Sequence, residues 1–215
     1  MAYILKQIPA PETKEYPKIY LIDHDVIGWI KQKVINMDRE LCASMKPSKK
    51  HYGYLVISSE TIKIGPVLDP KKQGQRGLCE YKKYSDILLH IHPSNAEGYP
   101  TTKDILDTLE HHEKMQVSVI GTRWGIWVLY NKYHLPSNYS ERNKDILRKK
   151  ISKEIKNFEL IENVQKSDLE NIANVILKVD NITNMAIDLY LWSDISSKKD
   201  KIPVRVYDNI SKSAY

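Results

Sequence analysis

A short apolar run that ends in two histidines constrains the fold of this 215-residue chain more than any other feature. After Asp86 the sequence reads Ile-Leu-Leu-His-Ile-His and then meets Pro93. A continuous apolar run of this length, closed by a proline, is typical of a strand buried inside a sheet. The segment 86–92 is therefore expected to be an interior strand that ends at its histidines.

The two histidines at the end of this strand alternate with Ile91. In a strand, both imidazoles of His90 and His92 would lie on one face while Ile91 packs on the other. Pro93 would place them at the exposed end of the strand. Such a pair can ligate a metal ion. The isolated motif also fits two histidines in a polar loop, or buried histidines with satisfied hydrogen bonds.

A second motif, Thr101-Thr102-Lys103-Asp104, follows a polar loop that contains glycine and proline. Thr101 followed by an acidic residue three positions later is close to a capping box, which alone predicts only that a helix begins there. The helix would bury three aliphatic residues, Ile105, Leu106 and Leu109. Asp104 can also fold back toward the histidines. Two imidazoles and one carboxylate form the ligand set of a zinc ion with one open position.

Apolar periodicity predicts the elements around these motifs. Residues 18–22 are expected to form a strand, and Asp23 or Asp25 can cap the helix that follows. That helix would bury four residues at helical spacing, Val26, Ile27, Ile30 and Val34. Further strands are expected at 40–45, 52–58, 61–67, 115–121 and 125–130. This order predicts an α/β fold in which a mixed β-sheet is flanked by helices.

Beyond Pro136 the pattern becomes charged and helical. One helix is expected to bury Ile146, Leu147, Ile151 and Ile155. A capping box from Ser167 to Glu170 would open a second helix, residues 182–192 could form a third, and 202–206 could be a late edge strand. Three segments follow: an extended lead-in at 1–17, a domain at 18–135 and a mainly helical carboxyl-terminal extension at 136–215.

Charge and composition restrict the class of protein only broadly. The net charge of +6 and a pI near 9.0 permit an acidic partner or weak nucleic-acid contact without requiring either, and a solvated basic surface is the simpler interpretation. No apolar run approaches the roughly 18 residues of a membrane span, and no signal peptide is evident. Two cysteines are too few for a disulfide framework. We therefore expect no membrane segment and a reducing, cytoplasmic location.

The motifs in this order resemble those of the JAMM/MPN+ metalloprotease family. That family has an upstream glutamate, then His-x-His-Pro, then Ser-x-x-Asp after a short loop. Here Glu40 lies in Glu-Leu-Cys-Ala-Ser-Met, which looks like the family's Glu-x-Cys-Gly-x-Leu segment. His90, His92 and Asp104 match the metal ligands, and Thr101 falls where the serine stands. The resemblance covers roughly residues 18–135 and implies an MPN-like sheet.

The resemblance also implies a mechanism. One zinc ion per chain would be held by His90, His92 and Asp104, with a water in the open position. Glu40 would act as general base and acid, and the Thr101 hydroxyl would help to stabilise the oxyanion. The substrate class implied is an isopeptide or peptide bond at the carboxyl tail of ubiquitin or a ubiquitin-like protein.

Three departures from the family pattern stand out. Thr101 replaces the serine, Ala43 stands where glycine is common, and the loop from His92 to Asp104 is one residue longer than is usual. None of these departures removes a metal ligand.

Other functions stay open at this stage. The family also contains non-catalytic MPN modules that assemble into larger complexes, although these usually lack the ligands. A RadC-like, nucleic-acid-associated branch shares the His-x-His-Pro motif. The sequence does not predict an oligomeric state.

The remaining histidines and cysteines are expected to have structural roles. Asp23-His24-Asp25 resembles a metal cluster, but helix capping accounts for its aspartates. His111 and His112 suit the end of a helix. Cys42 is expected to be a small buried residue rather than a nucleophile.

Overall fold

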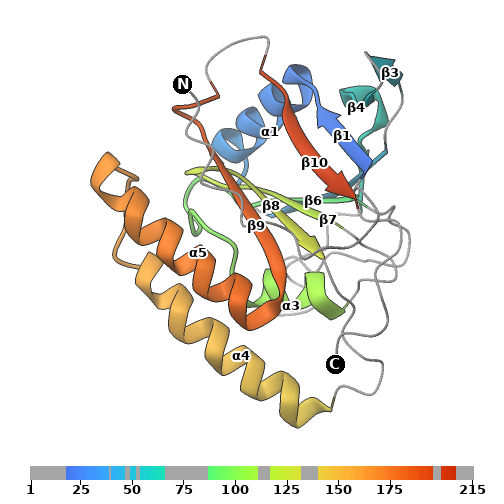
Figure 1. Ribbon diagram of the computed structural model, residues 1–215. Helices are drawn as coiled ribbons and strands as arrows, with labels where there is room; N and C mark the ends of the chain where they lie inside the picture. Colours follow the sequence, from blue (N-terminus) through green and yellow to red (C-terminus); the bar gives the residue numbers. More distant parts are fainter. Residues whose placement is uncertain are drawn as a thin grey trace.

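The computed structural model describes residues 18–38, 40–46, 49–51, 54–65, 87–110, 117–131, 140–195 and 200–206. Within these residues the chain forms a mixed α/β fold with two mixed sheets and four helices (Figure 1). The helices are α1 (His24–Asn36), α3 (Thr102–Glu110), α4 (Glu141–Ile155) and α5 (Leu169–Thr183).

The larger sheet has six strands in the order β5-β2-β6-β7-β8-β9. Their bounds are β5 Lys63–Ile64, β2 Leu41–Met45, β6 Ile87–Ile91, β7 Val117–Gly121, β8 Gly125–Asn131 and β9 Met185–Leu191. The β6–β7 pair is parallel, and the other pairs are antiparallel. Every residue of β6 is buried, which confirms the interior strand expected from the apolar run.

The smaller sheet has four strands in the order β10-β1-β4-β3. Their bounds are β10 Ile202–Val206, β1 Lys18–Ile22, β4 Tyr54–Ile57 and β3 Lys49–His51. β10 is an edge strand, as predicted. The strands predicted at 52–58 and 61–67 correspond to the shorter β4 and β5, which lie in different sheets and are joined through a 3-10 turn at Ser59–Thr61.

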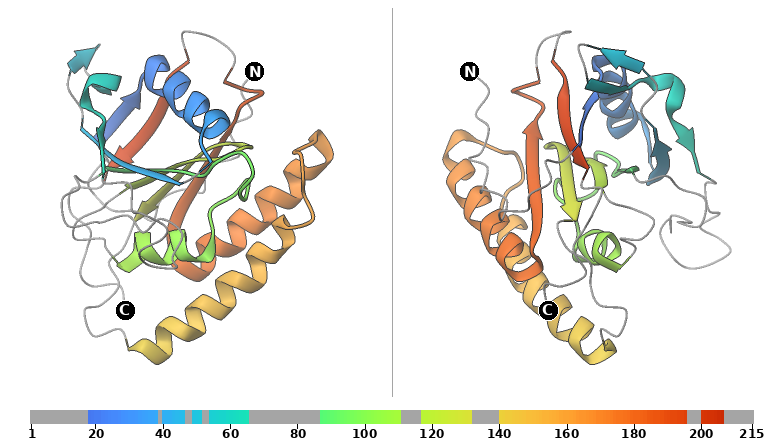
Figure 2. Two further views of the ribbon diagram at one scale, coloured as in Figure 1. Left: turned by 180° about the vertical axis from the view of Figure 1, so that it is seen from behind. Right: turned by 45° about the vertical axis from the view of Figure 1, so that its right-hand side comes forward.

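The six-stranded sheet separates two hydrophobic cores. One core packs the sheet against α1 and the smaller sheet, and the other packs it against α3, α4 and α5 (Figures 1 and 2). Strand β8 shows the alternation: Ile126 and Val128 enter the first core, whereas Trp127 and Leu129 enter the second. Successive side chains of a strand point to opposite faces, so each interior strand contributes to both cores.

Helix α1 forms as predicted. The Asp23 carboxylate accepts a hydrogen bond from the His24 N–H, and the helix buries the four residues expected at helical spacing, Val26, Ile27, Ile30 and Val34. This helix therefore covers the first core.

The prediction of a third helix at 182–192 was wrong. Asn184 ends α5 with a left-handed φ of 52°, and β9 begins at the next residue. In β9, Met185 and Ile187 enter the second core while Ala186 packs on the first, which is a period of two. Because β9 pairs with β8 and β10 pairs with β1, the segment 136–215 completes both sheets and is not only a helical extension.

Two details of α4 and α5 also differ from the prediction. Ile146 was expected in the core but is 45% exposed. The capping box before α5 uses Gln165 and Asp168, because the Asp168 carboxylate accepts from the Gln165 N–H; it does not use Ser167 and Glu170.

Candidate metal centre

The two histidines lie at the carboxyl end of β6, on the face of the sheet turned away from α1. Ile91 between them is fully buried in the core under α1, so both imidazoles project to the other side, as the alternation predicts. Their ring centroids are 4.8 Å apart. The His92 N–H donates to the Gly121 carbonyl at 2.8 Å, which ties the second histidine to the neighbouring strand β7.

Glu40 reaches the histidines from the start of the adjacent strand. β2 runs antiparallel to β6 with Cys42 opposite His90, so the residue before β2 is brought beside the end of β6. Residues opposite one another in such a pair share a face. The Glu40 Oε2 atom lies 3.3 Å from His90 Nε2. The Glu40 side chain is 26% exposed, whereas that of His92 is 1% exposed, so Glu40 stands at the rim of the cluster.

Asp104 reaches the same histidines from the first turn of α3. Its Oδ1 atom lies 3.1 Å from His90 Nδ1, and its Oδ2 atom lies 3.3 Å from His92 Nε2. The Thr101 N–H and hydroxyl both donate to Asp104 Oδ2 at 2.7 Å, and the Asp104 N–H donates back to the Thr101 hydroxyl at 3.2 Å. This reciprocal capping box aims the carboxylate at both imidazoles.

Thr101 therefore has a definite partner in the structure. A hydroxyl carries one proton, and Thr101 donates it to Asp104. The role predicted for Thr101, donation to an oxyanion, would require that proton to leave Asp104. The geometry makes Thr101 a positioning residue for the Asp104 carboxylate.

Aromatic side chains anchor the loop between His92 and α3. The Gly98 carbonyl accepts from Trp127 Nε1 at 3.0 Å, and a Cβ atom at Gly98 would lie 2.2 Å from Trp124 Nε1. The Tyr99 ring lies 5.1 Å from the ring of Phe158, which follows α4. Sequence reasoning missed these supports. The only local signal was the glycine in the loop, which here permits close approach to an indole.

Three imidazole nitrogens of the cluster are buried without a hydrogen-bond partner: His90 Nε2 and both ring nitrogens of His92. The 3.3 Å contacts to Glu40 and Asp104 are ion-pair distances without hydrogen-bond geometry. Buried polar atoms are rarely left unpaired, and a bound ion is one way to satisfy them. Ligand atoms that share a tetrahedral zinc at about 2.0–2.1 Å would be roughly 3.3 Å apart. The contacts in this cluster match that spacing.

Glu40, His90 and His92 form a group that could hold a metal ion. One ligand atom from each lies within 4.8 Å of the others. Asp104 contacts both histidines but is outside this group. Two ligand sets are therefore compatible with the geometry. In the predicted set Asp104 binds the metal and Glu40 does not. In the other, Glu40 binds it while Asp104 orients His90 through Nδ1, as outer carboxylates commonly do.

Electrostatics favour ionised groups in the metal-free cluster. Burial would lower the pKa of His90, but the Asp104 and Glu40 carboxylates raise it to about 9. Burial would raise the pKa of Asp104, but His90 and His92 hold it well below its usual range. At neutral pH the metal-free protein therefore has a protonated His90 between two carboxylates. A metal ion would have to displace that proton.

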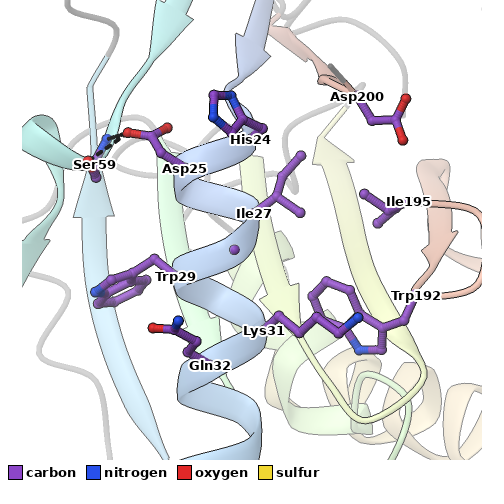
Figure 3. A pocket seen from close by; sticks show the side chains of 11 residues that line it. His24, Asp25, Ile27, Trp29, Lys31, Gln32, Ser59, Trp192, Ile195 and Asp200 are labelled. Atoms are coloured by element: carbon purple, nitrogen blue, oxygen red, sulfur yellow. Dashed lines mark hydrogen bonds between the residues drawn. The ribbon is translucent and has the colours of Figure 1, made fainter. Parts of the chain in front are cut away.

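The second acidic cluster of the sequence has a structural role. Asp25 accepts from the Ser59 N–H and hydroxyl, in addition to the capping by Asp23. Both His24 and Asp25 line an open groove of about 560 Å³ along α1, with Trp29 and Trp192 at its sides (Figure 3). Because α1 covers the opposite face of the sheet, this groove is separate from the histidine cluster.

Cys42 is disulfide-bonded and so provides no free thiol as a nucleophile or ligand. Disulfides persist mainly in oxidising environments, so the cysteine count does not decide the compartment, and the cytoplasmic location stays a prediction. No helix of the described residues is long and apolar enough to cross a membrane. The predictions for His111, His112 and Cys79 lie outside the described residues.

No model of a known protein family matches this chain, and no curated protein matches it. The JAMM/MPN+ resemblance therefore depends on the motif residues and on their arrangement in space.

Proposed function

We propose that this protein is a zinc-dependent peptidase of the JAMM type that cleaves an isopeptide or peptide bond at the tail of a ubiquitin-like protein. One observation carries the proposal. Glu40, His90 and Asp104 meet within 3.1–3.3 Å from three separate elements, beside a His92 whose ring nitrogens have no hydrogen-bond partner. This is the residue order and chemistry that the resemblance implies for a hydrolytic zinc site.

The donor set fits zinc. Imidazole nitrogen and carboxylate oxygen are ordinary zinc ligands, and three protein ligands leave a position open in catalytic sites. A bound zinc ion would polarise a carbonyl and lower the pKa of a bound water to about 7. The same donors also accept other divalent transition metals, so metal analysis is part of the test.

The residues of the chain would supply binding, orientation and proton transfer. Glu40 stands at the rim, where water and substrate can reach it, and would take a proton from the attacking water. It would return this proton to the leaving amine, which is a poor leaving group unless protonated. Thr101 would hold Asp104 in place, and Asp104 would hold both imidazoles.

The decisive experiment compares metal content and cleavage across matched glutamate variants. Wild type, Glu40→Gln and Glu162→Gln are purified, their zinc content is measured, and each is assayed on ubiquitin and ubiquitin-like fusions. Glu162 is exposed and distant in sequence from the cluster, so it controls for the loss of one carboxylate. We expect chelator-sensitive cleavage by wild type and Glu162→Gln, and none by Glu40→Gln. Cleavage that survives both chelation and Glu40→Gln would contradict the proposal.

The same variants decide between the two ligand sets. If Asp104 is the ligand and Glu40 the base, Glu40→Gln keeps one metal per chain while turnover is lost. If Glu40 is the ligand, Glu40→Gln loses metal, whereas Asp104→Asn weakens metal binding only about 10–100-fold. Wild-type protein that binds no metal and cleaves no fusion would instead favour a non-catalytic MPN-type module.

A further inference from the structure

Helix α4 and the residue after it present a line of positive charge to solvent. Arg142, Lys149, Lys153 and Lys156, spaced at i, i+7, i+11 and i+14, share one helical face. We call these four residues the α4 cationic stripe. All four are exposed, and they span about 21 Å at the 1.5 Å rise of an α-helix. α4 itself lies at the periphery of the molecule (Figures 1 and 2).

The stripe lies opposite the buried face of the helix. Leu147, Ile151 and Ile155 pack into the second core, half a turn away from the stripe. The exposed side of α4 also carries Ile146, which is 45% exposed. Because the apolar face of α4 is already buried in protein, the helix cannot insert that face into a membrane surface.

The carboxylates of α4 are neutralised by cations that lie outside the stripe. Glu141 pairs with Lys144, Asp145 pairs with Arg148, and Glu154 pairs with Lys178 of α5. By contrast, none of the four stripe residues forms an ion pair or hydrogen bond with any residue that the structure describes. The stripe is therefore an uncompensated line of charge on a chain whose net charge is +6.

We propose that the α4 cationic stripe binds the phosphate backbone of a double-stranded nucleic acid. A duplex carries one negative charge per roughly 1.7 Å, or about 12 charges along 21 Å, which matches a continuous line of cations. Folded protein surfaces usually intersperse both signs of charge, and they match such a line poorly. The stripe carries no aromatic or amide side chain, so binding involves backbone contacts without base reading or stacking.

Salt dependence tests this proposal on the full-length chain. Four phosphate contacts predict a slope of about −3.6 for log K against log salt concentration, which is roughly a 100-fold loss of affinity between 50 and 200 mM. The probes are labelled 20-base-pair DNA and RNA duplexes of mixed sequence, measured by fluorescence anisotropy. Binding of either duplex at 50 mM salt supports the proposal. Absence of binding to both would overturn it.

A matched pair of double variants tests the location. Lys149→Gln with Lys153→Gln removes two stripe cations, whereas Lys144→Gln with Lys178→Gln removes two cations that already have carboxylate partners. Both pairs change the net charge equally, and glutamine keeps the helix propensity. The stripe variant should reduce the salt slope by about two, while the paired-cation variant leaves it nearly unchanged. Equal reductions in both would overturn the proposal, because the binding would then reflect net charge.

Two further readouts separate duplex binding by the stripe from misfolding and from attraction to any polyanion. Circular dichroism and metal content should match wild type in both double variants, so a negative result does not depend on misfolding or on the proposed zinc chemistry. Stripe-dependent binding to polyglutamate or phosphatidylserine vesicles, without binding to either duplex, would overturn the assignment of a nucleic-acid partner.

Discussion

On the face of the six-stranded sheet that packs under α1, β6 contributes only aliphatic side chains, whereas on the opposite face it contributes His90. Leu89 and Ile91 are fully buried among apolar neighbours of the first core. His90, only one residue from each, is buried between two carboxylates. The first face gains stability from burial of apolar area, and the second accepts the cost of burying polar groups. Stability and metal binding should therefore respond to different substitutions on one strand.

The largest effect should come from removing a ligand common to both possible metal sets. His92→Ala deletes the least exposed imidazole, so metal affinity should fall far more than the 10–100-fold typical of outer partners, and cleavage should be lost. Titration with zinc under a competing chelator measures the affinity. Wild-type affinity in a folded His92→Ala protein would show that the cluster is not the metal site.

A large-to-small change on the other face should separate stability from metal binding. Leu89→Ala removes a fully buried side chain and should destabilise the fold by about 2–5 kcal/mol. The free energy of unfolding is measured with denaturant, and zinc affinity is measured where the variant is fully folded. Zinc affinity close to that of wild type is expected. A matched loss of zinc affinity would mean that the two faces are not independent.

The raised pKa of His90 predicts a pH dependence confined to the polar face. In the metal-free protein this pKa is about 9, above the ordinary 6.5, so its stabilising contribution is complete below about pH 6.5 and is lost as the pH rises through 9. Zinc must displace the same proton, so apparent affinity should rise about tenfold per pH unit between pH 7 and 9. Calorimetry in two buffers of different ionisation enthalpy counts the proton.

A variant that removes the main cause of this shift provides the control. Asp104→Asn should bring the pKa of His90 down, so that less proton is released on metal binding at pH 8. Unchanged proton release in Asp104→Asn would mean that another group supplies the proton.

The smallest expected effect concerns the support of Asp104. Thr101→Ala removes the side-chain hydrogen bonds of the helix cap, with an expected loss of about 1 kcal/mol in the free energy of unfolding. Zinc affinity should fall about 10–100-fold, because Asp104 is no longer oriented. Thr101→Ser keeps the hydroxyl and should restore both quantities. If Thr101→Ala loses only turnover while zinc affinity stays at the wild-type value, Thr101 acts on the substrate and not through Asp104.

Sequence reasoning predicted the parts of this site that depend on local periodicity. The placement of His90 and His92 on one face follows from the two-residue period of a strand, and the contact between Thr101 and Asp104 follows from the chemistry of a helix start. Both patterns lie within a window of a few residues. Neither needed knowledge of any distant segment.

The failures have an opposite origin. Residues 182–192 contain enough apolar residues for either a helix or a strand, and pairing with β8 decided for the strand. Phe158, which supports the loop between the histidines and α3, lies more than fifty residues away from them in the sequence. No local pattern indicates such a contact.

What the sequence by itself determined is therefore the set of chemical groups and their local orientation: two imidazoles on one side of an interior strand, and a carboxylate held at a helix start. The tertiary structure decided that Glu40 stands beside His90, that the imidazoles are buried without hydrogen-bond partners, and that both sheets need the last seventy residues. The physical reason is range. Dihedral preferences and side-chain periodicity act over a few residues, whereas strand pairing and burial depend on the whole chain.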